Sequence, residues 1–132
     1  MPSVQRGDLV GWVVTYERAW RAQGTAGLAD LFTPDATYLP EPYAEPVRGL
    51  EAIGRFWEDG RDGPDEVFRM QSEVLAVEGD VGVVRVEVRY GEPARQEYRD
   101  LWIVRTDASG RCTAFEEWPF WPGHGLSPET AG

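Results

Sequence analysis

The first part of the chain carries apolar residues at helical spacing. Over residues 8–23 they recur every three or four positions, which predicts a helix with one buried face. Asp8 suits the start of this helix, where backbone N–H groups are unpaired, and Gly24 suits its end. The inward stripe comprises Leu9, Trp12, Val13, Tyr16, Ala19 and Trp20.

Shorter elements follow this helix. Thr25 can cap a second helix that runs through Leu28 and Leu31-Phe32, and Pro34 is expected to stop it. Residues 35–39 then predict a short strand, and a proline-punctuated loop covers 40–46. A third helix is expected from about residue 49 to 57, with Gly60 and Gly63 ending it.

The period changes from helical to alternating in the second half. Strands are expected over 67–78, 81–90, 95–106 and 111–121, joined by glycine-containing turns at 79–80, 91–94 and 107–110. Short turns between long strands are typical of an antiparallel meander. Helices first and strands afterwards predict an α+β fold in which about three N-terminal helices close a curved antiparallel sheet. Residues 1–122 would form this domain, and 123–132 a disordered tail.

One face of the predicted sheet mixes charged and apolar residues. It is interpreted either as a solvated face or as the surface through which two copies pair, and a homodimer through this face is expected. The charged members are Arg69, Glu73, Arg85, Glu87 and Arg89, and the apolar members are Val83, Leu101, Ile103 and Phe115.

Composition narrows the classes of function. The formal net charge of −10 repels phosphate backbones and anionic membranes, so nucleic-acid and membrane partners are not expected. No apolar run is long enough to span a bilayer and the first residues do not resemble a secretory signal, so a cytoplasmic location is expected.

The residue types that are missing narrow the chemistry further. All 13 basic residues are arginine, which excludes lysine chemistry, and the single histidine, His124, lies in the glycine-rich tail. Cys112 is the only cysteine and is interpreted as a small strand hydrophobe. No spacing typical of a metal site or a nucleotide-binding loop is present, so no cofactor and no metal are expected. Any catalysis would depend on Asp, Glu, Tyr and Arg.

Three polar residues are candidates for that chemistry. Tyr16 lies on the inward stripe of the first helix, and Asp100 alternates with Tyr98 and Trp102 on an aromatic strand face. Burial there would raise the pKa of Asp100, and a neutral carboxyl group can donate a hydrogen bond. Glu41 follows the first strand, between two prolines. The alternatives are that Tyr16 is an ordinary core tyrosine, that Asp100 pairs with Arg99, Arg105 or another arginine, and that Glu41 is simply exposed.

The chain resembles the nuclear transport factor 2-like (SnoaL-like) superfamily over residues 8 to about 121. The resemblance is carried by Tyr16-Glu17-Arg18-Ala19-Trp20, by Leu31-Phe32 before Asp35-Ala36-Thr37, and by the helix that ends at Phe56-Trp57. It implies a cone-shaped half-barrel around a pocket for an apolar small molecule. Tyr38, Trp57, Trp102 and Trp118 are the expected pocket residues.

Within the superfamily, the ketosteroid isomerases are the most similar in their polar residues. The resemblance implies that Tyr16 and a protonated Asp100 form an oxyanion hole and that a carboxylate after the first strand moves a proton. Glu41-Pro42 is similar to the family's acid-proline pair but stands one residue later in an ungapped placement, where Pro40 takes the position of the base.

Two hypotheses for function follow. The first is a cofactor-free acid-base enzyme, similar to an isomerase or cyclase, that acts on an apolar carbonyl compound through Tyr16, Asp100 and Glu41. The second is a non-catalytic ligand-binding or dimerisation module of the same fold. The Arg-x-Asp arrangement of limonene epoxide hydrolases is not expected, because Arg99 is adjacent to Asp100 and points to the opposite face.

Overall fold

A six-stranded curved sheet with helices on its inner side forms the protein. The computed structural model describes residues 4–22, 24–61 and 67–123. The helices are α1 (Arg6–Ala22), α2 (Leu28–Leu31) and α3 (Leu50–Gly60). The strands are β1 (Phe32–Leu39), β2 (Val47–Arg48), β3 (Phe68–Glu78), β4 (Val81–Tyr90), β5 (Gln96–Thr106) and β6 (Cys112–Phe120). This arrangement confirms the predicted α+β class.

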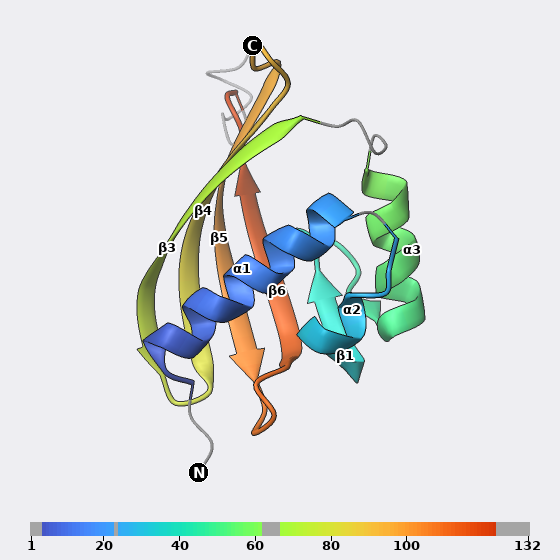
Figure 1. Ribbon diagram of the computed structural model, residues 1–132, viewed down its shortest axis with the longest axis vertical. Helices are drawn as coiled ribbons and strands as arrows, with labels where there is room; N and C mark the ends of the chain where they lie inside the picture. Colours follow the sequence, from blue (N-terminus) through green and yellow to red (C-terminus); the bar gives the residue numbers. More distant parts are fainter. Residues whose placement is uncertain (1–3, 23, 62–66, 124–132) are drawn as a thin grey trace.

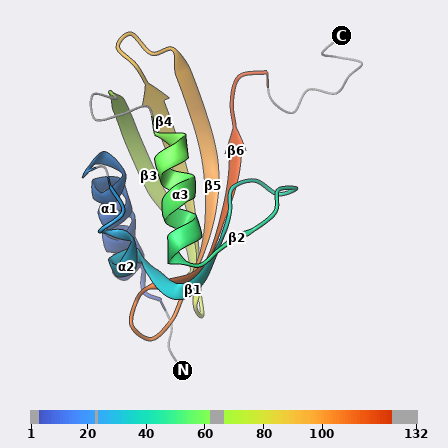
Figure 2. The same ribbon diagram turned by 90° about the vertical axis from the view of Figure 1, so that its right-hand side faces the viewer.

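The sheet has the order β2-β1-β6-β5-β4-β3. Strands β3 to β6 form the predicted antiparallel meander, whereas β1 lies parallel to β6. Figures 1 and 2 show the long strands twisting and curving, with α1 crossing their inner face and α3 standing beside β1. The sheet stays open, so the helices close the space that a full barrel would enclose.

Helix α1 is held by the apolar stripe that its sequence predicts. Leu9, Trp12, Val13 and Tyr16 are its buried residues, and this i, i+3, i+4, i+7 spacing places them on one face. Gly82 on β4 allows the close approach, because a Cβ there would overlap the Leu9 side chain. The Trp12 indole Nε1 donates to the Leu31 carbonyl oxygen at 3.0 Å and ties α1 to α2.

Two details of the N-terminal half differ from the sequence prediction. The second helix ends at Leu31, and β1 already begins at Phe32, so Pro34 lies within a strand instead of ending a helix. The edge strand β2 pairs with Thr37 and Tyr38 of β1. It was not predicted from the sequence, because it is two residues long and follows a proline-rich loop. Gly63 and the residues from His124 onward, which include nearly all of the expected tail, lie outside the described residues.

The outer face of the sheet carries the predicted charges in cross-strand pairs. Glu73 pairs with Arg85, and Arg99 lies 3.5 Å from Glu87. The placement of Phe115 on this face was wrong: Phe115 pairs with Val104 in the β5–β6 register and is 1% exposed in the core. Association of two copies through the outer face stays a prediction.

Candidate functional site

A cavity of about 380 Å³ lies between α1, α3 and the inner face of the sheet. A ligand site of this size is at the small end of the roughly 300–1,000 Å³ that small-molecule pockets occupy. Its lining is largely aromatic and apolar, with polar groups at two places. The residues are Tyr16, Trp20, Tyr38, Pro40, Phe56, Gly60, Phe68, Met70, Val88, Tyr90, Arg95, Gln96, Tyr98, Asp100, Trp102, Glu117 and Pro119.

A second cavity, of about 550 Å³, lies between the first half of α1 and the turn after β5. Its acidic side chains are Asp8, Asp30 and Asp107, and it contains none of the candidate residues. Within the described part of the chain, no group of three or more His, Cys, Asp or Glu side chains is arranged to hold a metal ion. The aromatic cavity is therefore the better candidate site.

Two tyrosines form a hydrogen-bonded pair in the aromatic cavity. The hydroxyl oxygens of Tyr16 on α1 and Tyr38 on β1 are 2.9 Å apart, and both side chains are buried. The Tyr16 ring packs 4.5 Å from Trp102 and 4.9 Å from Trp57, measured between ring centroids. Burial raises the pKa of both phenols well above 10, so each remains a neutral hydrogen-bond donor.

Two carboxyl groups meet next to the tyrosines. Asp100 on β5 and Glu117 on β6 come from paired strands, where Trp102 is opposite Glu117 and Asp100 is opposite Pro119. Side chains of these positions share the inner face, as alternation requires. The Tyr38 hydroxyl donates to Glu117 Oε1 at 3.5 Å, so the tyrosine pair and the carboxyl pair are continuous.

Burial raises the pKa of both carboxyl groups. A hydrogen-bonding interaction between them lowers the pKa of Asp100 and raises that of Glu117, in addition to the effect of burial. The Trp102 indole N–H lowers the pKa of each, although it lacks hydrogen-bond geometry with either. The interaction between the two groups therefore places the higher pKa on Glu117, and Asp100 is the member of the pair that loses its proton first as the pH rises.

The carboxyl group that ionises first has one oxygen without a partner. Asp100 is 5% exposed, and its Oδ1 is buried without a hydrogen-bond partner. A buried acceptor without a partner costs about 1–3 kcal/mol. Asp100 lines the cavity, so a bound molecule can approach this carboxyl group.

Of the three candidate residues, the structure brings Tyr16 and Asp100 into one cavity and leaves Glu41 outside it. Glu41 is exposed and begins a turn, in which its carbonyl accepts from Ala44 N at 3.0 Å. Pro40 lines the cavity instead, at the position that an ungapped comparison gives to the base. Because β1 ends at Leu39, the chain has already turned away when it reaches Glu41.

Of the four residues expected to line the pocket, two line the cavity and two do not. Tyr38 and Trp102 line the cavity, whereas Trp57 is fully buried behind Tyr16 and does not line it. Placing Trp118 in the pocket was wrong: it lies opposite Leu101 on the outer face, is 37% exposed, and donates to Glu116 Oε1 at 2.6 Å. Arg99 is exposed on that same face, as predicted, and lies away from the pocket.

Sequence reasoning missed Glu117. The signal was its spacing from Phe115: residues two apart on a strand share a face, so a core position for Phe115 would have placed Glu117 inside as well. Assigning Phe115 to the outer face concealed this relationship. Only the pairing of β5 with β6 decides which set of alternating residues faces inward.

Comparison with known proteins identifies the class. The model of the SnoaL-like domain matches residues 13–115, and the chain therefore belongs to the SnoaL-like domain family, within the nuclear transport factor 2-like superfamily. No curated protein matches the sequence.

Solved structures share the fold at low sequence identity. A candidate ketosteroid isomerase from Kribbella flavida is 15% identical, with a TM-score of 0.67 over 93% of this chain and 83% of the other. A candidate SnoaL-like polyketide cyclase from a Jannaschia species is 18% identical, with a TM-score of 0.68 over 86% of both chains. An LEH-like epoxide hydrolase from M. tuberculosis is 12% identical, with a TM-score of 0.67 over 87% of this chain and 84% of the other.

Among the described helices, none is long and apolar enough to cross a membrane.

The carboxyl pair leads to a prediction about stability and pH. A carboxyl group whose pKa is higher in the folded state contributes stability that is complete below its unfolded-state value and is lost as the pH rises through the folded-state value. The free energy of unfolding should therefore fall as the pH rises above the ordinary glutamate value of 4.5. Glu117→Gln should remove most of this fall, and so should gain stability relative to the native chain between pH 5 and 8.

Urea denaturation at several pH values measures this difference. Glu116→Gln is the matched control, because Glu116 is the neighbouring residue on the outer face and its curve should keep the native pH dependence. The gap between Glu117→Gln and the native chain should widen by about 1.4 kcal/mol for each pH unit between the unfolded- and folded-state pKa. A gap that stays constant with pH would show that Glu117 is ionised in the folded protein.

Proposed function

We propose that the protein is a cofactor-free acid-base enzyme that moves a proton on an apolar carbonyl compound, as an isomerase or cyclase does. The observation that supports it is the buried Asp100–Glu117 pair, beside two neutral tyrosines in an aromatic cavity. Removing a proton next to a carbonyl needs a base at the carbon and hydrogen-bond donors at the oxygen. The pair can supply both at a pH where Asp100 has ionised and Glu117 still holds its proton.

The roles follow from the order in which the groups ionise. Asp100, which lines the cavity and ionises first, takes the α-proton of the substrate. The electrons of the broken C–H bond form the C=C bond of the enolate, and the carbonyl π electrons move to oxygen. Neutral Glu117 donates a hydrogen bond to that oxygen. Tyr16 also donates to it when the Tyr38 hydroxyl hydrogen turns from Glu117 Oε1 to the Tyr16 oxygen, because Tyr16 then keeps its own hydrogen for the substrate. In a substrate whose enolate is conjugated with a further C=C bond, returning the proton from Asp100 to the far carbon of that bond shifts both double bonds and completes an isomerisation.

These roles revise the hypothesis drawn from sequence. Asp100 becomes the base instead of a donor, and Glu117 takes the part of the neutral acid. Glu41 has no part, since it is exposed and outside the cavity. Tyr16 keeps the role of a donor.

Exchange of α-protons in D₂O tests the proposal directly. Neutral cyclic ketones such as 2-tetralone fit a small aromatic cavity, and deuterium uptake is followed by NMR with and without the protein. We expect exchange above the buffer rate with the native chain and none above it with the Asp100→Asn/Glu117→Gln double variant. If the protein is a non-catalytic binding module, a different pair of results is expected. The native chain and the double variant would both bind 2-naphthol, which mimics the enol of 2-tetralone. Neither would catalyse exchange on any of the cyclic ketones tested.

A further inference from the structure

Trp102 carries a buried indole N–H that has no acceptor. The side chain is 2% exposed, and its Nε1 forms no hydrogen bond. A buried donor without a partner is costly, because it has lost its hydrogen bonds to water without replacing them. Trp20 and Trp57 also lack an acceptor, but their rings pack against the Arg61 guanidinium. Trp102 differs from both because two carboxyl groups adjoin it.

The pairing of β5 with β6 places Trp102 beside both carboxyl groups of the cavity. Glu117 lies directly opposite Trp102, and residues opposite each other in an antiparallel pair have Cβ atoms about 4.5–5.5 Å apart. Asp100 precedes Trp102 by two residues on β5, so the two side chains share a face at roughly 7 Å along the strand. All three residues line the cavity.

The aromatic neighbours of Trp102 leave the carboxyl groups as the acceptors for its N–H. Its ring centroid lies 4.5 Å from that of Tyr16 and 5.2 Å from that of Phe115. Phe115 has no hydrogen-bond acceptor atom in its side chain, and the Tyr16 hydroxyl already forms a hydrogen bond with Tyr38. Among the described residues that contact this ring or adjoin it across the strands, the two carboxyl groups hold the remaining acceptors.

Asp100 contributes the matching unpaired group. Its Oδ1 is a buried acceptor without a donor, on the same strand face as the unpaired N–H of Trp102. Trp102 lowers the pKa of Asp100, so the N–H is close enough to favour the ionised carboxyl group. A small side-chain rotation that joins these two atoms removes both unpaired groups at once. The gain is greater after Asp100 ionises, because a hydrogen bond to a carboxylate is about twice as strong as one between neutral groups.

Asp100 is also faced by titratable groups from neighbouring elements. The interaction with Glu117 on β6 lowers the pKa of Asp100, as Trp102 does. Tyr16 on α1 and Tyr38 on β1 remain neutral, because burial raises the pKa of both phenols. The remaining titratable residues of the lining come from β4, from β5 and from the turn between them: Tyr90, Tyr98 and Arg95.

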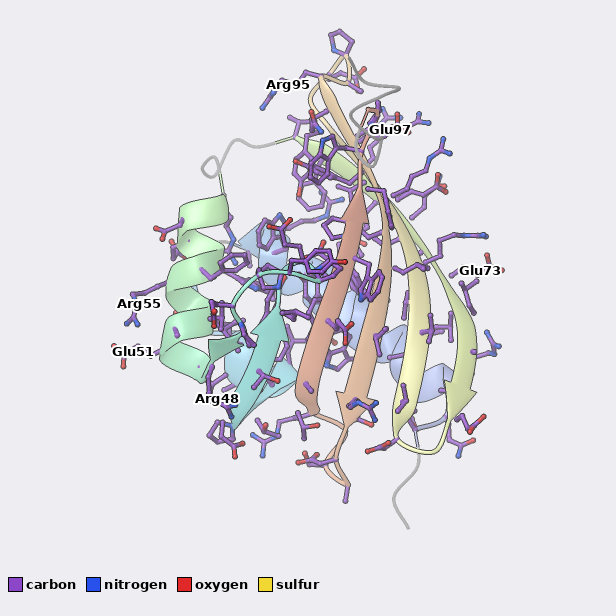
Figure 3. The ribbon with its side chains drawn as sticks, turned by 180° about the vertical axis from the view of Figure 1, so that it is seen from behind. Arg48, Glu51, Arg55, Glu73, Arg95 and Glu97 are labelled. Atoms are coloured by element: carbon purple, nitrogen blue, oxygen red, sulfur yellow. The ribbon has the colours of Figure 1, made fainter. Side chains whose placement is uncertain are left out.

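The charged residues of α3 and β3 point away from the cavity. In the part of the chain that the structure describes, none of the residues that these two elements contribute to the lining titrates: they are Phe56, Gly60, Phe68 and Met70. Figure 3 shows Arg55 on α3 and Glu73 on β3 extending outward from the fold. Glu117 and Trp102 are therefore the side chains that favour the ionised form of Asp100.

We propose that Trp102 is a positioning residue for the proton transfer: its indole N–H closes onto Asp100 when that carboxyl group loses its proton, and holds the base ionised while Glu117 is still neutral. This inference deepens the proposed function and rests on it for the role of Asp100 as the base. The contact between Trp102 and Asp100 itself does not require a substrate.

The contact is tested first in the native chain without any ligand. ¹⁵N-labelled tryptophan gives an indole N–H signal for each of the six tryptophans, and the signal that Trp102→Phe removes belongs to Trp102. We expect its proton to move downfield as the pH rises, with the same midpoint as the change in the ¹³C shift of the Asp100 carboxyl carbon. Glu117→Gln should keep this movement and Asp100→Asn should abolish it. The proposal is overturned if the Trp102 signal does not follow Asp100, or if it moves as much in Asp100→Asn.

The pH dependence of ketone exchange separates this role from a merely structural one. Trp102→Phe keeps an aromatic ring and removes the N–H, so the rise of the exchange rate should shift upward by about one pH unit while the maximum rate changes only a few-fold. Trp12→Phe is the matched control, because it removes an indole N–H of the same aromatic cluster that donates to the Leu31 carbonyl oxygen. Its profile should keep the native midpoint. A rate lowered equally at every pH in Trp102→Phe, with an unchanged midpoint, would contradict the proposal.

The two measurements also distinguish a failure of this inference from a failure of the proposed function. If the Trp102 signal follows Asp100 but no ketone exchanges, the contact is supported and the proposed function fails. If ketones exchange while the Trp102 signal is indifferent to Asp100, the proposed function is supported and the role of Trp102 is overturned.

Discussion

Replacing Asp100 with asparagine is expected to lower the rate of α-proton exchange on a bound ketone about 10²- to 10⁴-fold, the contribution that a positioned general base usually makes. Asparagine keeps the shape of the side chain and removes only its ability to accept the proton. Asp100 lines the cavity and is the member of the pair that ionises first, so it is the carboxylate placed to take the proton. Affinity for 2-naphthol should change only a few-fold, because the aromatic lining is untouched.

Glu41→Gln is the matched control for this loss. It removes one carboxylate that sequence similarity suggested as the base but that lies in the exposed β1–β2 loop. Deuterium exchange measured by NMR should proceed at the native rate in Glu41→Gln. If Glu41→Gln lost the exchange and Asp100→Asn kept it, the proton would have to be taken by a carboxylate outside the cavity, and the roles proposed for the pair would be wrong.

The proton shared by the pair also limits the pH range of activity. Exchange requires Asp100 ionised and Glu117 neutral, and burial raises the pKa of both groups. The exchange rate should therefore rise with pH as Asp100 ionises and fall again as Glu117 loses its proton. The two apparent pKa values of this profile belong to the pair and not to either residue alone.

The elements of this fold could be predicted from local patterns because each has a clear period and clear ends. The stripe on α1 and the alternation along β4 are both strong, and glycines with positive φ stand at three of the turns. The start of β1 was harder to predict. Phe32 and Thr33 are buried by their neighbours β6 and α1, and this tertiary contact outweighs the local preference of a short helix for continuing to Pro34.

The site could be predicted only in part, for a related reason. Tyr16 and Asp100 could be recognised as candidates because each is a polar residue on the apolar face of a single helix or strand, and the periodicity of that one element is enough to show this. Glu117 did not, because its position depends on the register between two strands, and one residue of slip moves a side chain to the opposite face. The same uncertainty about register placed Trp118 in the predicted pocket and left Glu117 out of it.

Trp57→Ala should cause the largest loss of stability, about 3–5 kcal/mol, as expected for a fully buried aromatic side chain replaced by alanine. The Trp57 ring packs against Tyr16, Trp20 and Phe32, with centroids 4.9, 5.1 and 6.4 Å away. Truncation would leave a cavity behind Tyr16, because the Trp57 ring fills the space between α3 and the Tyr16 and Trp20 rings of α1.

Trp118→Ala provides the matched comparison for Trp57→Ala, because it deletes the same side chain from the outer face, where Trp118 is 37% exposed. Chemical denaturation should show a loss of less than about 1.5 kcal/mol for Trp118→Ala, since much of that ring stays in water in the folded chain. Equal losses in the two variants would mean that Trp118 is covered in the folded protein. Because outer faces of two chains could cover it, the concentration dependence of unfolding would then separate a dimer from a different fold of β6.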